Sequence, residues 1–227
     1  VLHIIKYTFL IEFIFGSILA FHFYPIYGER AFYLGYWHSV SAFCNAGFDL
    51  FGNYDSLTKF VGDGVVNFCV MSLITLGGLG FIVMDDVLSK RNFKSLTVHS
   101  KVVILASAAL VITGTVFFRL IELNNPDTLA NLSYADQWLA SMFQAVTPRT
   151  AGFNTLPLEK VEDSSLFLLV IMMVIGASPA STGGGIKTTT LAVILMSTWA
   201  VLRGRNDIVI FERRISKKAV NKAFTIL

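Results

Sequence analysis

Long apolar runs and short aromatic runs alternate along the chain in the order long, short, long, and this order occurs twice. A helix rises ~1.5 Å per residue and the hydrocarbon core of a bilayer is ~30 Å thick, so about 20 apolar residues are needed to cross it. The long runs meet this requirement and the short runs do not. The pattern predicts spans at about residues 3–24, 64–88, 101–121 and 164–202, with short helices at about 31–44 and 134–146.

The two short runs are predicted to be re-entrant half-helices that enter the membrane and turn back. Non-helical backbone survives at membrane depth only where protein buries it or where it lines a water-filled cavity. A pore is therefore a natural site for the loops that follow these helices. The alternative is a surface hairpin with an interfacial helix. The first interpretation gives an all-α membrane protein with two tandem span, re-entrant pore helix and span repeats, residues 1–96 and 97–227.

The last apolar run must be interrupted, because roughly 40 residues in one straight helix would extend ~60 Å. Residues 176–190 contain glycines, Pro179 and hydroxyl side chains, which disfavour a continuous helix. This break fits a gate in which Lys187 adds a positive barrier, or a packed kink in which Lys187 reaches an acidic partner. The glycine cluster in Leu76–Phe81 fits close helix packing and pore lining equally well.

Composition supports the membrane class. Hydrophobic residues make up 54% of the chain and charged residues 15%, a balance typical of membrane proteins. Cys44 and Cys69 both fall in predicted membrane segments, so we expect neither a disulfide framework nor a zinc site. The sequence begins at Val1 inside an apolar run, and we expect it to be a fragment. It predicts no bound cofactor.

Enzymatic and nucleic-acid-binding functions are not predicted. Gly183–Thr188 is similar to a phosphate-binding loop, but Ile186 stands where that loop needs a glycine. Ser178 lacks the glycine surroundings of a hydrolase nucleophile, and no histidine has an evident pairing with it. The basic segments flank the apolar runs and are not interleaved with exposed aromatic residues, which argues against nucleic acid as a partner.

The distribution of charge predicts the orientation in a cell membrane. Cytoplasmic loops of membrane proteins carry an excess of lysine and arginine. Cations follow the second and fourth predicted spans, so the loop between the two repeats and the C-terminal tail are expected to be cytoplasmic. The acidic loops, and with them the re-entrant segments, are expected to face outward and to attract cations. The basic positions are Lys90, Arg91, Lys94, Lys101, Arg203, Arg205, Arg213, Arg214, Lys217, Lys218 and Lys222.

The two loops that follow the short helices share the tripeptide Ala-Gly-Phe, once in Ser41–Asp49 and once in Gln144–Asn154. A dehydrated K⁺ needs several oxygens at once, and backbone carbonyls supply them where a glycine permits an unusual conformation. Each loop also follows the negative end of a helix dipole. The candidate ion-binding carbonyls are those of Asn45, Ala46, Gly47 and Phe48, and of Thr150, Ala151, Gly152 and Phe153.

Three side chains beside these loops are expected to brace them. Phe48 and Phe153 are predicted to pack behind the two loops. Arg149 is unsuited to a cation path, so we expect its side chain to turn away and pair with an acidic group. Because each loop has one glycine, where a longer filter has two, we also expect softer selectivity against Na⁺.

This arrangement of spans, half-helices and single-glycine loops resembles the Trk/Ktr/HKT superfamily of potassium transporters, and among them the bacterial Ktr-type membrane subunit. The resemblance extends over essentially the whole chain. It implies that the broken span holds the family's intramembrane gating loop. The gating residues would be Gly176, Ala177, Ser178, Pro179, Ala180, Ser181, Thr182, Gly183, Gly184, Gly185, Ile186 and Lys187.

The resemblance also implies what the chain lacks. Family members have four such units around one pore, and these two are similar to the second and third. It further implies membrane lipid as the surroundings, a homodimer of the complete subunit, and a cytoplasmic nucleotide-binding regulatory ring. The sequence leaves Na⁺ dependence open. The alternative function is a non-transporting membrane scaffold or receptor in which the half-helices only pack.

Overall fold

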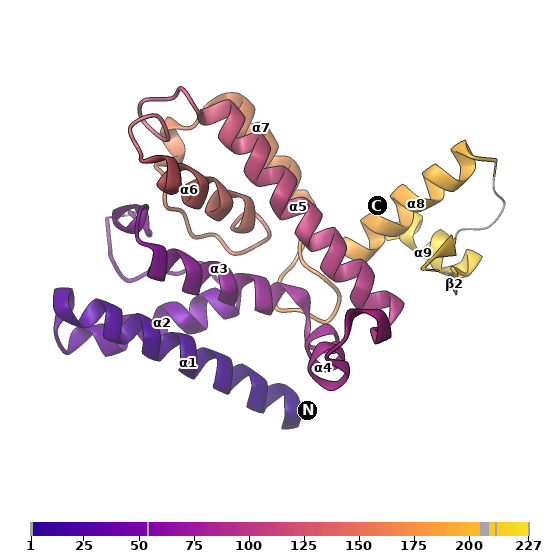
Figure 1. Ribbon diagram of the computed structural model, residues 1–227, viewed down its shortest axis with the longest axis horizontal. Coiled ribbons are helices and arrows are strands. Elements are labelled where there is room, and N and C mark those ends of the chain that lie inside the picture. The colour runs from indigo at the N-terminus through magenta and orange to yellow at the C-terminus, as the bar shows by residue number, and fades with distance from the viewer. Residues whose placement is uncertain (1, 54, 205–208, 212, 227) are drawn as a thin grey trace.

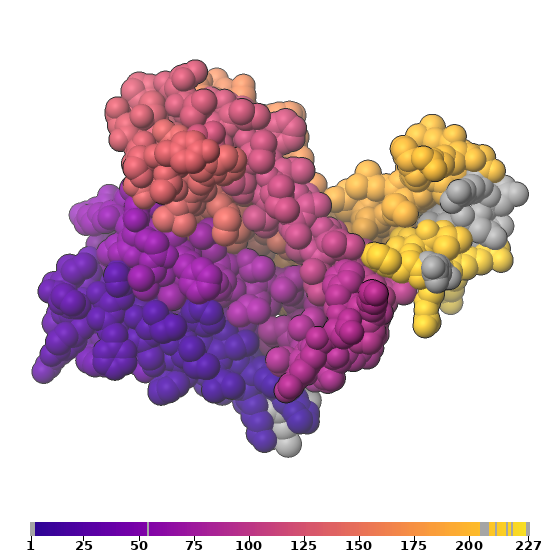
Figure 2. All heavy atoms as spheres, viewed as in Figure 1, coloured from indigo at the N-terminus to yellow at the C-terminus, as the bar shows by residue number. Residues whose placement is uncertain are grey.

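The computed structural model of this protein describes residues 2–53, 55–204, 209–211 and 213–226. Its helices form two adjoining groups, α1 to α3 within residues 2–79 and α5 to α7 within residues 98–174, and the C-terminal part extends away from them (Figure 1). The space-filling view shows the same division, with residues 188–204 and 213–226 projecting to one side (Figure 2). Arg205 lies outside the described residues.

The first group begins with a hairpin of two helices, α1 (Leu2–Tyr27) and α2 (Arg30–Phe43). Their tight packing depends on Gly35, because a Cβ there would lie 2.5 Å from the backbone nitrogen of Ala20. The helix α1 continues past Pro25, where the apolar run was expected to end. A proline removes one N–H and one helical hydrogen bond, and this loss falls in the last turn.

The second long run of the first group is bent rather than straight. The helix α3 (Gly64–Leu79) begins at Asp63, whose carboxylate accepts hydrogen bonds from the nitrogens of Val65 and Val66 at 3.0 Å. It ends at Gly80, which has a φ of +91°, and α4 (Phe81–Lys90) leaves at an angle of 97°. The predicted run over 64–88 is therefore helical in two parts that meet at a sharp bend.

The second group repeats the long, short, long order. Val98–Glu122 forms α5, whose N-terminus is capped by Thr97, and Tyr134–Val146 forms α6. The last run is divided into α7 (Asp163–Val174) and α8 (Thr188–Leu202) by an irregular segment. The remaining elements are three short 3₁₀ turns, η1 (Thr58–Phe60), η2 (Phe93–Ser95) and η3 (Leu158–Lys160), the strands β1 (Val209–Ile210) and β2 (Arg213–Arg214), and α9 (Lys217–Ile226).

Helices long and apolar enough to cross a membrane are present in the described part of the chain. These are α1 and α5, and α3 with α4 makes a third if the bent pair is one span. Large apolar side chains such as Phe13 on α1, Ile112 on α5 and Phe167 on α7 are exposed. Since water would make such surfaces unfavourable, they are suited to lipid. The core lies where the groups meet, and it combines Phe43 and Phe60 with Phe143 and Phe153.

Candidate functional site

The two Ala-Gly-Phe loops lie against each other at the junction of the two groups. Gly47 has a φ of +72° and Gly152 a φ of +90°, a region that side chains disfavour. A Cβ on Gly47 would lie 2.3 Å from the carbonyl oxygen of Ala151 and 3.0 Å from the Cα of Gly152. Glycine is therefore required at Gly47 for both conformation and space. The fold brings together the two loops that the sequence singled out.

Each loop emerges from the C-terminal end of a short helix. The helix α2 ends at Phe43, and α6 ends at Val146. The C-terminal end of a helix carries a partial negative charge of about half an elementary charge. The negative ends of both helices therefore lie at the start of the two loops whose glycines meet, which favours a cation there.

Side chains of the short helices hold the last carbonyl of each loop. Ser41 Oγ donates to the Phe48 oxygen at 2.8 Å and Trp37 Nε1 donates to it at 3.2 Å, and Thr147 Oγ1 donates to the Phe153 oxygen. Among the described residues, the three preceding carbonyls of each loop accept no hydrogen bond. These six carbonyls belong to Asn45, Ala46, Gly47, Thr150, Ala151 and Gly152.

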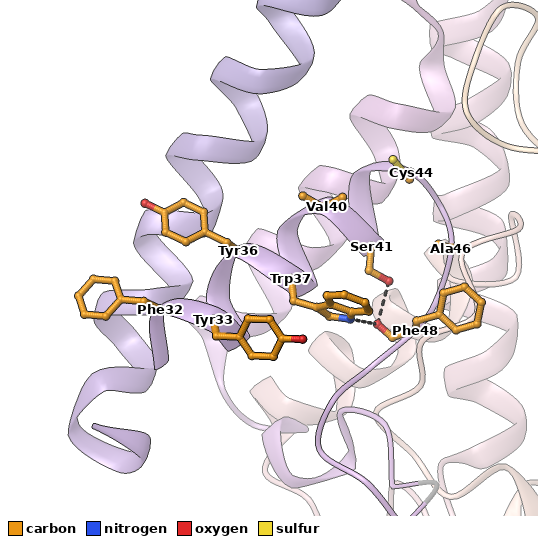
Figure 3. A pocket seen from close by; sticks show the side chains of 9 residues that line it. All are labelled: Phe32, Tyr33, Tyr36, Trp37, Val40, Ser41, Cys44, Ala46 and Phe48. Carbon is orange, nitrogen blue, oxygen red and sulfur yellow. Dashed lines mark hydrogen bonds between the residues drawn. The ribbon is translucent and has the colours of Figure 1, made fainter. Parts of the chain in front are cut away.

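The two phenylalanines differ, and the expectation that both pack behind the loops is wrong for Phe48. Phe153 is 1% exposed, with its ring centroid 6.3 Å from that of His38. Phe48 is 68% exposed and lines an apolar groove of about 610 Å³ along α2, together with Trp37 and Tyr36 (Figure 3). Phe153 is enclosed because the first group packs on it, whereas no described residue covers Phe48.

The segment between α7 and α8 reaches both glycine loops. Asn45 Nδ2 donates to Thr182 Oγ1 at 3.3 Å, and the Gly184 nitrogen donates to Thr150 Oγ1 at 3.1 Å. Asn45 and Thr150 are equivalent, since each lies two residues before its glycine and each has a positive φ, 52° and 71°. One irregular segment therefore contacts the same position of both loops.

The glycine cluster of α3 is the surface on which this segment rests. The nitrogens of Thr182 and Ser178 donate to the oxygens of Gly77 and Gly78 at 3.2 and 3.0 Å. A Cβ on Gly77 would lie 2.0 Å from the Phe43 oxygen and 2.8 Å from Thr182 Oγ1. The sequence left packing and pore lining open for this cluster, and the structure assigns it to packing against the segment 176–187. In Figure 1 that segment passes beside the end of α3.

The same contact explains the bend after α3. The Phe81 nitrogen donates to the Ala180 oxygen at 3.0 Å, and a Cβ on Gly80 would lie 2.5 Å from the Pro179 oxygen. The inserted segment thus occupies the space that a straight helix would need. Gly80, the third glycine of the cluster, marks in the sequence a position where a helix can bend. The sequence did not indicate that a segment about 100 residues later would pack against Gly80.

Lys187 and Arg149 have neutral partners in the described part of the chain. Lys187 Nζ donates to the Gly183 oxygen at 2.8 Å, so it closes the segment on itself. Arg149 turns away from its loop as expected, but its Nη2 donates to Ser107 Oγ at 3.0 Å. Neither cation has a carboxylate within ion-pair distance among these residues, so the expected acidic partner of Arg149 is not found there.

Comparison with known protein families gives one match over the whole chain. The model of the TrkH family, described as "Cation transport protein", matches residues 1–227. The chain is also similar to the crystal structure of the potassium transporter TrkH from Vibrio parahaemolyticus, with a TM-score of 0.70 and 18% identity over 93% of this chain and 45% of that one. At this identity the structural likeness supports the fold.

Curated relatives show higher identity. Ktr system potassium uptake protein B is 39% identical in Vibrio alginolyticus, over 92% of this chain and 46% of that protein. Its Bacillus subtilis (strain 168) counterpart is also 39% identical, over 100% of this chain and 52% of that protein. The potassium/sodium uptake protein NtpJ of Enterococcus hirae is 37% identical, over 99% and 49%. The chain therefore spans about half the length of the curated relatives it matches.

Proposed function

The chain belongs to the TrkH family of cation transport proteins, and we propose that it forms part of a potassium uptake subunit. In this proposal K⁺ passes along the carbonyl oxygens of the two glycine loops, which line part of the pathway, and the segment 176–187 gates it. Membership of a cation transport family also agrees with the prediction that the chain is not an enzyme.

The chemistry of the loops supports a dehydrated cation. The six carbonyls without hydrogen-bond partners lie in two loops that touch, next to the negative ends of α2 and α6. The similar proteins from Vibrio and Bacillus are named potassium uptake proteins, which supports K⁺ as the ion. The relative from Enterococcus is named for potassium and sodium, in keeping with modest discrimination by single-glycine loops.

The observation that carries the proposal is the contact between Gly47 and Gly152. These residues are far apart in the sequence, yet a Cβ on the first would lie 3.0 Å from the Cα of the second. Plain helix packing would need neither the positive φ of both glycines nor six neighbouring carbonyls that accept no hydrogen bond from the described residues. A site for a cation accounts for all three features.

The gating part of the proposal follows from the hydrogen bonds of Thr182 and Gly184. Thr182 Oγ1 donates to the Phe43 oxygen at 2.9 Å, and the Gly184 nitrogen is bound to Thr150. A conducting state would break these bonds and those that join the segment to Gly77, Gly78 and Phe81, and would move the glycine-rich segment aside. Each such bond contributes about 0.5–1.5 kcal/mol, so opening would need a signal of a few kcal/mol.

The remaining parts of the mechanism involve partners outside this sequence. Two loops surround only part of an ion, so the remaining units of the same subunit would complete the ring, and the complete subunit would form a homodimer. The loops would face the outside of the cell membrane. A cytoplasmic nucleotide-binding ring would dock near the exposed cations Lys90, Arg91 and Lys94 at and after the end of α4.

The test is ion competition in the full-length subunit carrying Gly47→Ser or Gly152→Ser. Both substitutions place a side chain at a positive φ, and the first also forces it into the other loop. We expect each to lower the ratio of K⁺ to Na⁺ uptake at least tenfold. The control is Gly64→Ser, because nothing lies within 4 Å of a Cβ there. An unchanged ratio in well-expressed glycine-loop variants would show that the loops are not the filter.

A further inference from the structure

A second cavity lies away from the glycine junction, between α3 and α5. Its volume is about 520 Å³, within the range of ~300–1,000 Å³ typical of ligand pockets. The lining is apolar, including Met71, Leu79 and Val111, apart from a few hydroxyl groups and one charged residue, Arg149. Along α3 it extends from Phe68 to Leu79, which is ~16 Å of helix. The cavity is therefore elongated along α3 and almost entirely hydrophobic.

Arg149 is poorly satisfied for a buried cation. Its side chain is 5% exposed and offers five N–H donors. Nη2 donates to Ser107 Oγ, and Nε is buried without a partner among the described residues. Ser107 lies in the first half of α5, a helix long and apolar enough to cross a membrane, so we expect the guanidinium to lie at membrane depth. A cation at the centre of a spanning helix costs about 2.5–3.5 kcal/mol even on a lenient scale, which an anion nearby would offset.

We propose that this cavity binds an amphiphile with one acyl chain and an anionic head. The head would accept hydrogen bonds from Arg149, with Ser107 and the hydroxyls of Ser72 and Thr75 close by on the lining. The chain would lie along α3 and α5. Phe68, at one end of the lining, is exposed together with neighbouring apolar side chains of the lipid-facing surface, so the ligand can enter from the bilayer. A small inorganic anion would leave the apolar lining without contacts.

The proposed anion site adjoins only the second of the two glycine loops. Arg149 directly precedes Thr150, so a ligand on the guanidinium would hold the start of the second glycine loop. The equivalent residue before the first loop is Cys44, which cannot bind an anion in this way. The proposal concerns the cavity and does not depend on the assignment of the loops as a filter.

The experiment uses the purified full-length subunit and a palmitic acid that carries a photoreactive diazirine on its chain. After illumination, labelled peptides are mapped by mass spectrometry. We expect label on the cavity faces of α3 and α5, and at least a tenfold loss of that label with Arg149→Gln. Arg149→Lys, which keeps the charge, should retain at least half of it. Arg119→Gln is the matched control, because Arg119 stacks on Tyr134 and Trp138 away from this cavity.

A second variant leaves the arginine in place. Ala108 lines the cavity, so Ala108→Phe should fill it and also reduce labelling at least tenfold. This variant keeps the proposal testable if Arg149→Gln is poorly folded. Label that persists unchanged in Ala108→Phe, or in a folded Arg149→Gln, would overturn the proposal.

Competitors identify the head group. Unlabelled palmitate or a lysophospholipid with a phosphate head should displace the probe. The competitor that displaces it at the lower concentration shows whether the site prefers a carboxylate or a phosphate head. Hexadecanol, which has the same chain without charge, should compete at least tenfold less well. Equal competition by hexadecanol would contradict a role for Arg149. Absence of label from α3 and α5 in the unaltered protein would mean that the rest of the subunit fills the cavity, and would also overturn the proposal.

Discussion

The two glycine loops share a tripeptide and differ in how far the side chains around it are covered. The second loop is enclosed, with Phe153 buried and Arg149 turned into a cavity. The first loop is open on one side, with Phe48 exposed beside an aromatic groove. Both nevertheless have a glycine at positive φ and both contact the segment 176–187. The common features are those of the backbone, which is where the proposed ion chemistry lies.

The largest expected difference between the loops concerns their phenylalanines. In the full-length subunit, Phe153→Ala should lower the free energy of unfolding by about 3–5 kcal/mol, because it empties a buried site. If the remaining units close the ring over the groove, Phe48→Ala should cost at least half as much. Thermal unfolding of the two variants in the same detergent measures this. A neutral Phe48→Ala would show that the groove stays open and would contradict ring closure at that face.

A second prediction concerns what the loops share. Removing Gly183–Thr188 from the full-length subunit deletes the contact to Thr150 and should raise basal K⁺ flux about tenfold, since it removes the proposed obstruction. Thr182→Val removes the hydrogen bonds of the Thr182 hydroxyl to the Phe43 oxygen and to Asn45. It should raise flux a few-fold, as on the order of 1 kcal/mol of the interaction that holds the segment is lost. Flux into vesicles is the measurement. Unchanged or lower flux in well-expressed deletion protein would argue that the segment is structural.

The smallest expected effect concerns the hydroxyl groups that donate to the last carbonyl of each loop, that of Phe48 and that of Phe153. Thr147→Val removes the hydroxyl that binds the Phe153 oxygen, and we expect a loss of about 1 kcal/mol in stability. Ser41→Ala should cost less, because Trp37 Nε1 still donates to the Phe48 oxygen. Unfolding curves for the two variants, with Ser197→Ala on α8 as a control, test the order. A reversed order would mean that Trp37 does not substitute for Ser41.

Much of this arrangement could be predicted from hydrophobic patterning, and the failures have a common cause. The short helix over Tyr134–Val146 and the break after α7 follow from local composition, and the structure places both there. The bend at Gly80 and the exposure of Phe48 depend on residues distant in the chain or outside it. Hydrophobic periodicity describes one segment at a time. It shows that a glycine allows close approach of another backbone, but it does not indicate which segment will pack there.

The neutral partners of Arg149 and Lys187 were missed for a related reason. A sequence suggests that a charge in an apolar run needs an opposite charge, because that is the least costly solution. In the fold, Lys187 instead reaches a carbonyl four residues earlier and Arg149 a hydroxyl on α5. Backbone carbonyls and hydroxyl groups are so common along the chain that the sequence pattern cannot predict which of them will accept the hydrogen bond.

In the proposed function Gly47 and Gly152 belong to one ion site. This is tested most directly by diffraction from crystals of the full-length subunit grown in Rb⁺, whose anomalous signal locates the ion. We expect an anomalous peak beside the two loops, within coordination distance of the carbonyls of Ala46 or Gly47 and of Ala151 or Gly152. Anomalous density confined to other parts of the protein, with both loops well ordered, would contradict it.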